Sequence, residues 1–145
     1  MKFTAISLLL ATSSVFASPL IERDSSLQIS DFQASASAGS SASMHFVLTD
    51  PNYPDDTPTD CNLIWSYGSK PKLNARCNNS QYYIRFPGGA VDFHKFILEL
   101  ERVSGPIPRN GHVTVTSGTE WSCLENPTEG VQLRCSYDGI LNIPV

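Results

Sequence analysis

The sequence has no long apolar run beyond its first residues, few basic residues and none of the common metal or catalytic motifs. A transmembrane helix needs roughly 20 consecutive apolar residues, and no segment after position 17 reaches that length. Lys and Arg number 10 against 14 Asp and Glu, a formal net charge of −4, which makes nucleic acids and anionic membranes unsuitable partners. No C-x-x-C or G-x-S-x-G motif occurs, and no His stands in ligand spacing with a Cys. We therefore expect no cofactor, no metal and no membrane association.

The first residues have the pattern of a secretory signal peptide, which we assign to residues 1–17. Met1 and Lys2 form a short positive start. An apolar run covers residues 5–11, and residues 15–17 (VFA) fit a small-residue cleavage site. The apolar run is too short to span a bilayer as a helix. We therefore expect a secreted, extracellular protein.

The rest of the chain divides into a short lead and one domain. We expect residues 18–26 to be a disordered lead or a short pro-segment, which a protease that cuts after Arg23 would trim. Residues 27–145 have the usual size of a single folding unit, and we predict that they form one β-barrel domain. Small secreted domains of this kind commonly depend on disulfides for stability.

Four cysteines lie in the predicted domain, and an even number in a secreted chain indicates disulfides. Three pairings are open from the sequence. We favour Cys61–Cys77 and Cys123–Cys135, because each pair flanks a short segment with the pattern of a hairpin or strand and turn. Closing loops of that length stabilises a fold by roughly 3 kcal/mol each on the chain-entropy account.

Apolar and polar residues alternate with a period of two along most of the domain, which is the pattern of half-buried antiparallel strands. Clusters of Pro, Gly, Asp and Asn separate these segments and predict turns. The stretch from Ala34 to Ser43 contains only small residues and shows no core pattern. We predict an all-β fold, a single small antiparallel β-barrel or sandwich stapled by two disulfides. The alternating segments are Leu27–Phe32, Met44–Leu48, Cys61–Tyr67, Tyr82–Phe86, His112–Thr116 and Val131–Tyr137.

The segment Val91–Val103 fits two patterns. Its apolar residues have helical spacing behind a possible Asp92 cap, and the same segment also alternates as a strand would. Gly and Pro flank the segment on both sides, and the surrounding pattern is all-β. We therefore favour a strand.

Four features follow one another in the domain: YYIRF at 82–86, FILEL at 96–100, the W-S-C step at 121–123, and Cys135 followed by the tail IPV at 143–145. Together they resemble the fungal family of the Alternaria major allergen. The resemblance spans roughly residues 27–145 and implies a small secreted β-barrel protein. It also implies a role as an elicitor of plant cell death or as an effector. The family has no agreed catalytic residues, so the resemblance assigns none.

We predict a secreted, non-enzymatic interaction protein, a fungal effector, elicitor or allergen-like protein that acts on a host extracellular component as a monomer or weak homodimer. The alternative is a small-ligand or glycan binding protein of the same fold. A second alternative is a small secreted ribonuclease with Glu99 as base, Arg102 as phosphate clamp and His112 as acid. His94 would be the second acid–base partner, but the strand pattern places Glu99 and His94 on opposite faces.

The best candidates for a contact surface are one loop and one outward-facing aromatic residue. The segment Asp50–Asp60 has four acids and three prolines, so we expect it to stay out of the core as a stiff, exposed loop. Tyr53, Asp55 and Asp56 are its candidate binding residues, since aromatic residues are enriched at interface hot spots. Tyr83 is the best candidate elsewhere, because its neighbours along the strand point the other way.

Three further features have weaker signals. Asn78 begins an N-x-S sequon in a polar turn, so it is a candidate glycosylation site on the surface. The loop Gly105–Gly111 is a second candidate contact element. The acids of the Asp50–Asp60 segment lack the order of a calcium-binding loop, so we expect no calcium site.

Overall fold

The computed structural model describes residues 26–37, 39–105 and 110–145. The predicted signal peptide, most of the predicted lead and the central residues of the Gly105–Gly111 loop lie outside the described residues.

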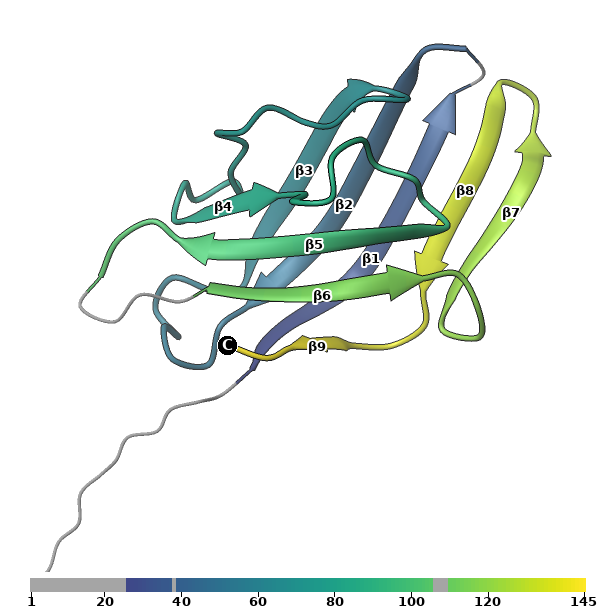
Figure 1. Ribbon diagram of the computed structural model, residues 1–145. Coiled ribbons are helices and arrows are strands. Elements are labelled where there is room, and N and C mark those ends of the chain that lie inside the picture. The colour runs from purple at the N-terminus through teal and green to yellow at the C-terminus, as the bar shows by residue number, and fades with distance from the viewer. Residues whose placement is uncertain (1–25, 38, 106–109) are drawn as a thin grey trace, which may run out of the picture.

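The described part of the chain contains nine strands, arranged in two antiparallel sheets (Figure 1). The small sheet has the order β4-β5-β6, and its strands cross in front of the large sheet in Figure 1. The small sheet consists of β4 (Tyr82–Arg85), β5 (Lys95–Arg102) and β6 (Asn110–Thr116). The large sheet consists of β1 (Leu27–Ser37), β2 (Ser41–Thr49), β3 (Thr59–Ser66), β7 (Trp121–Thr128), β8 (Val131–Tyr137) and β9 (Leu141–Ile143).

The order of the large sheet is β3-β2-β1-β8-β7, and β9 pairs with β1. β3 and β7 are therefore its two edges, and no pairing between them closes the sheet. The prediction of an all-β antiparallel barrel or sandwich is confirmed in its sandwich form, since the large sheet of the described residues is not closed as a barrel. At one end β6 comes close to the C-terminal segment. A Cβ added at Gly111 would lie 2.6 Å from the Pro144 carbonyl oxygen, so only glycine fits there.

Residues 91–103 form a turn followed by β5, so the strand prediction is confirmed. β5 alternates along its length, with Phe96, Leu98 and Leu100 buried and Ile97 and Glu99 partly exposed. A helix would have placed Glu99 and Phe96 on one face, whereas the strand separates them. The strand is favoured because it buries one row of apolar side chains against the large sheet.

The stretch of small residues from Ala34 to Ser43 belongs to the core, so the expectation that it lacks a core pattern is wrong. It forms the end of β1 and the start of β2, and Ala34, Ala36 and Ala42 are buried. Ala42 is paired across the sheet with Trp65, a small side chain next to a large one. The period of two is present in this stretch, but Ala and Ser differ too little in hydrophobicity for the pattern to stand out.

Aromatic side chains fill the space between the two sheets. Phe32 of β1 lies against Trp121 of β7, with ring centroids 4.6 Å apart, and Phe96 of β5 meets Trp121 at 5.7 Å. The indole N–H of Trp121 donates a hydrogen bond of 2.7 Å to the carbonyl oxygen of Phe93. Aromatic contacts of this kind add about 0.5–1.5 kcal/mol per pair beyond the burial of apolar area. They fix the small sheet over the large one.

The two predicted disulfides, Cys61–Cys77 and Cys123–Cys135, are both present. Cys123 and Cys135 occupy paired positions on β7 and β8, so this disulfide reinforces an existing strand pair. Cys61 lies on β3, whereas Cys77 lies in the segment that leads to β4. The first disulfide therefore joins parts of the chain that no strand pairing connects.

Each disulfide is expected to contribute to stability separately. Replacing Cys123 and Cys135 together by Ala, or Cys61 and Cys77 together, should lower the free energy of unfolding by about 2–5 kcal/mol, because the unfolded chain regains freedom that the crosslink removes. Urea denaturation of the two double variants and the oxidised parent measures the loss. Peptide mapping of the parent that found a Cys61–Cys123 link or free thiols would contradict the pairing.

Candidate functional site

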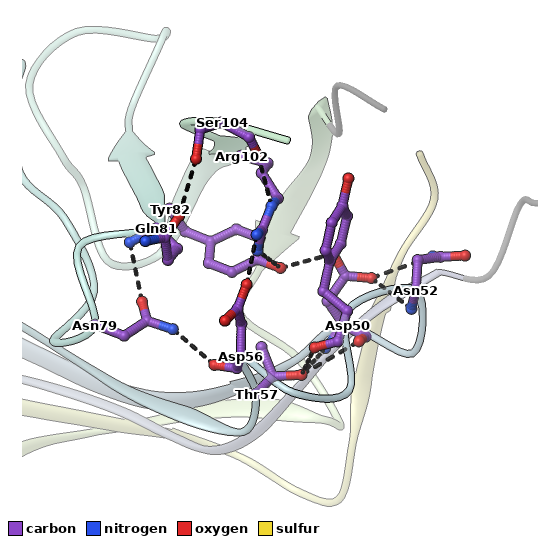
Figure 2. Close-up of polar contacts among 10 residues, drawn as sticks. Asp50, Asn52, Asp56, Thr57, Asn79, Gln81, Tyr82, Arg102 and Ser104 are labelled. Atoms are coloured by element: carbon purple, nitrogen blue, oxygen red, sulfur yellow. Dashed lines mark hydrogen bonds and ion pairs between the residues drawn. The ribbon is translucent and has the colours of Figure 1, made fainter. Parts of the chain in front are cut away.

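The segment between β2 and β3 packs into the domain. Asp50 is fully buried, and its carboxylate accepts a hydrogen bond of 2.7 Å from the Tyr82 hydroxyl (Figure 2). The backbone and side-chain amides of Asn52 donate to the same carboxylate at 3.0 and 3.1 Å. The Thr57 hydroxyl accepts the backbone N–H of Asp50 at 3.0 Å. The expectation that this segment stays out of the core is therefore wrong for Asp50, because the donors of Tyr82 and Asn52 satisfy its buried carboxylate, whereas Pro51, Pro54 and Asp55 are exposed as expected.

Arg102, the last residue of β5, joins this segment to the small sheet and is 9% exposed. Its Nη1 donates to the Tyr82 hydroxyl at 3.1 Å and its Nε to the Ser104 carbonyl at 2.7 Å. Its Nη2 forms an ion pair with the Asp56 carboxylate. The Cζ atom also lies 3.6 Å from the centroid of the Tyr53 ring. Each guanidinium nitrogen thus has a partner, which offsets the loss of hydration on burial.

Asp50, Asp56, Tyr82 and Arg102 form what we call the buried network. Burial, followed by the hydrogen bond to Asp50, raises the pKa of Tyr82 well above its usual range, because both disfavour the phenolate. For Arg102, burial acts to lower the pKa, but hydrogen bonds to Asp56 and Tyr82 outweigh it and the pKa is raised. Tyr82 is therefore neutral and Arg102 is charged at physiological pH.

The candidate contact residues of this segment have different positions. Tyr53 and Asp56 are partly buried and hold Arg102 in place. Asp55 is exposed and makes no hydrogen bond or ion pair with the described residues. The binding roles of all three stay predictions. Asp55 is the one whose replacement can test a contact without disturbing the buried network.

Tyr83 faces outward from β4, as predicted, since Tyr82 and Ile84 on either side are buried. The guanidinium groups of two arginines lie over its ring, with Cζ 4.6 Å from the centroid for Arg76 and 4.4 Å for Arg85. Arg76 also donates a hydrogen bond of 3.0 Å to the Tyr83 hydroxyl. We call Arg76, Tyr83 and Arg85 the arginine–tyrosine patch. The sequence reasoning missed both arginines, because they are seven and two residues from Tyr83 and only the fold brings Arg76 near.

A groove adjoins the patch, and Arg76 lines it as well. Its volume is about 510 Å³. One wall is residues 62–66 of β3, and the other is formed by residues between Ser69 and Arg76. We call it the β3-edge groove. A volume of this size lies within the range of roughly 300–1,000 Å³ that ligand pockets occupy.

The residues of the ribonuclease alternative do not all meet in one place. Glu99 of β5 is paired with His112 of β6, and both face away from the core. Arg102 faces the interior, and His94 lies in the exposed turn before β5. Arg85 is paired with Glu99 from the other side, so Arg85, Glu99 and His112 form a row across the small sheet. The sequence did not indicate Arg85, because its place in the row depends on the register of β4 against β5.

A small apolar cavity of about 230 Å³ lies at the start of β5. Phe86, Val91, Phe96 and Ile97 contribute to its lining. Pockets for drug-sized ligands usually have volumes of roughly 300–1,000 Å³. This cavity is therefore small for the ligand that the small-ligand alternative requires.

Other features that the sequence raised have the following positions. Asn78 is exposed, as its sequon predicts, and its occupancy is untested. Within the described ranges, no group of three or more His, Cys, Asp or Glu side chains is placed to hold a metal ion. Residues 26–37, 39–105 and 110–145 contain no helix long and apolar enough to cross a membrane. The two disulfides fit an extracellular protein.

Comparison with protein-family models, with curated proteins and with solved structures finds no match to this chain.

The raised pKa of Tyr82 predicts how stability depends on pH. The unfolded chain releases this proton near pH 10, whereas the folded chain holds it to higher pH. The contribution of Tyr82 to the free energy of unfolding is therefore fully present below about pH 10. Above that pH it is lost by up to about 1.4 kcal/mol per pH unit. Tyr82→Phe should make the loss above pH 10 less steep. At pH 7 it should destabilise by about 1–3 kcal/mol, because Asp50 and Arg102 each lose a partner.

Urea denaturation of the parent and of Tyr82→Phe between pH 7 and 11 measures both effects. Tyr67→Phe is the matched control, since Tyr67 is partly buried and its hydroxyl makes no hydrogen bond with the described residues. A Tyr82→Phe profile that coincides with that of Tyr67→Phe would contradict the role assigned to the buried network.

Proposed function

We propose that this protein is secreted and acts as a non-enzymatic interaction protein, an effector or elicitor that binds a host extracellular protein. The arginine–tyrosine patch carries the proposal. Tyr83, Arg76 and Arg85 are the residue types most enriched at interface hot spots, and they lie together on the surface of the small sheet. The resemblance to the family of the Alternaria major allergen supports the same class of function.

The patch suits a protein partner because its side chains are held in place before binding. Arg76 is tied to the Tyr83 hydroxyl, and Arg85 forms an ion pair with Glu101 on β5. Long side chains that are already ordered lose less conformational entropy on association. Arg76 is exposed and forms no ion pair with the described residues, so its remaining guanidinium donors can bind carboxylates of a partner. A rigid surface that offers an aromatic ring and two planar cations fits a protein surface with acidic groups.

A small ligand fits the apolar cavity at the start of β5 less well. The apolar cavity at the start of β5 has few polar groups and a volume of only about 230 Å³. Ligand sites are usually larger and orient their ligand with several converging polar groups. The arginine–tyrosine patch lies on an open sheet face. Such a face favours a macromolecular partner.

The non-enzymatic part of the proposal is supported by the positions of the candidate acid–base residues. Arg102 is committed to the buried network and faces away from Glu99 and His112. Arg85, which lies in the same row as Glu99 and His112, is paired with Glu101. A phosphate clamp would have to break one of these ion pairs.

Replacing Tyr83 and Arg76 together by Ala should weaken binding to the partner at least tenfold, on the order of 1.4 kcal/mol. The assay is retention of proteins from host extracellular fluid by the immobilised, oxidised protein, followed by a titration with the retained protein. Arg134→Ala is the matched control, because Arg134 is an exposed arginine on β8 of the other sheet. It should bind as the parent does.

Two results would contradict the proposal. One is equal retention by the parent and by the folded Tyr83/Arg76 double variant. The other is cleavage of RNA by the purified parent that the combined replacement Glu99→Gln and His112→Ala abolishes. The proposed function predicts that the variant with Glu99→Gln and His112→Ala keeps full biological activity.

A further inference from the structure

One edge of the large sheet has backbone groups that face the β3-edge groove. The Asp60 carbonyl accepts the N–H of Asn78 at 2.8 Å, and the Ser66 carbonyl accepts an N–H of the following turn at 3.2 Å. Both carbonyls therefore point away from β2, the partner of β3 in the sheet. Backbone direction in an antiparallel strand alternates with a period of two residues. The N–H and C=O groups of Asn62 and Ile64 therefore point to the same side, into the groove.

These groups have no partner on the far wall of the groove. Among the residues that the structure describes, no hydrogen bond joins the backbone of Asn62 or Ile64 to the segment between Ser69 and Arg76. The chain on this side is hydrogen-bonded to β3 at the Ser66 turn, before the segment, and at the Asn78–Asp60 bond, after it. Between these two points the chain leaves an open space of about 510 Å³ beside an unpaired strand edge. An unpaired edge of this kind is a template for another strand.

The groove is basic although the whole chain is acidic. Lys70, Lys72 and Arg76 line it, and no carboxylate in the described ranges forms an ion pair with any of them. The net charge of the chain is −4, so a concentration of three cations on one wall is a local property. Oppositely charged segments are attracted to such a surface, and the attraction also sets the orientation of the bound segment.

We propose that the β3-edge groove binds an extended acidic segment of the partner protein, which adds to β3 as an additional strand. The inference rests on the proposed function and names the chemistry and the binding mode of that partner. Main-chain hydrogen bonds to Asn62 and Ile64 supply affinity, as in other complexes that form by strand addition. Acidic side chains of the segment meet Lys70, Lys72 and Arg76. Arg76 also belongs to the arginine–tyrosine patch, so the two surfaces are continuous.

The lysines could instead protect the edge against pairing with other chains, since charged residues commonly have that role on exposed edges. Protection predicts that no strand adds there, whatever its charge. Strand addition predicts that acidic extended peptides bind and that binding requires their backbone N–H groups. The two readings therefore differ in a measurable way.

The probe is a fluorescein-labelled octapeptide of alternating Glu and Val, titrated into the full oxidised protein and followed by fluorescence anisotropy. A peptide of alternating Lys and Val is the charge control and should bind at least tenfold more weakly. Two N-methylated forms of the acidic peptide, methylated at odd or at even positions, test the backbone. One form should lose binding at least tenfold and the other should retain it, because only alternate N–H groups face β3.

Two variants of one residue test the same edge from the side of the protein. Ile64→Pro removes an N–H that faces the groove and makes no bond to β2, and proline is tolerated at such edge positions. It should weaken binding of the acidic peptide at least tenfold. Ile64→Ala keeps the N–H and should bind the acidic peptide at least tenfold more tightly than Ile64→Pro does. Circular dichroism and thermal melting establish whether both variants fold. If Ile64→Pro does not fold, the two N-methylated peptides still test strand addition on the parent protein.

Several results would overturn the inference. They are absence of binding by the acidic peptide, equal binding of the acidic and basic peptides, and equal binding of both methylated forms. A host protein that is retained equally by Ile64→Pro and the parent, but is lost by the Tyr83/Arg76 variant, would overturn strand addition and leave the proposed function intact. Loss of retention by Ile64→Pro and by the Tyr83/Arg76 variant supports both strand addition and the proposed function.

Discussion

The hydrogen bonds around the Tyr82 hydroxyl are the constraint on which much of the surface depends. This single group donates to Asp50, in the segment after β2, and accepts from Arg102 at the end of β5. It lies on β4, so one buried hydroxyl connects two strands of the small sheet with a loop of the large one. A buried carboxylate and a buried guanidinium would each be costly alone, but the neutral phenol between them lets both keep partners. The small sheet is held in place by this network at one end and by the Trp121 contacts at the other.

The same network helps to position the chain that follows the outer wall of the β3-edge groove. Asp56 pairs with Arg102 through its carboxylate, and its carbonyl accepts the side-chain amide of Asn79 at 2.7 Å. The Asn79 side chain in turn accepts the backbone N–H of Gln81 at 3.0 Å, which fixes the turn before β4 (Figure 2). The Cys61–Cys77 disulfide ties the start of that turn to β3. The segment beside β3 is therefore anchored at the end that leads to β4.

The elements of the fold that depend on neighbouring residues could be predicted from the sequence. The period of two located most strands, the flanking Gly and Pro favoured a strand at 91–103, and the spacing of the cysteines indicated the two observed disulfides. The outward direction of Tyr83 also follows from parity along its own strand. The position of Asp50 could not be predicted, because its burial depends on Tyr82 and Arg102, which are distant in sequence. Composition alone suggested an exposed loop.

The candidate surface was harder to predict for the same reason. Arg76 and Arg85 are ordinary scattered cations in the sequence, and they become a patch only when the register of β4 and the path of residues 75–78 are fixed. The edge position of β3 depends on strand order, which a single sequence does not specify. An unpaired strand edge is a property of the backbone, so no particular residue composition reveals it. Reasoning from residue types therefore selected acids and aromatics in a loop and passed over a backbone edge.

Amide hydrogen exchange of the free, oxidised protein tests the open edge of β3 most directly. The N–H groups of Cys61, Leu63 and Trp65 point to β2 and should exchange slowly. Those of Asn62 and Ile64 should exchange much faster, because they face the groove and have no hydrogen-bond acceptor among the residues that the structure describes. This alternation along one strand is the predicted result. Uniform slow exchange across these five residues would show that the edge is covered, and would contradict the account of the groove as an open strand-binding site.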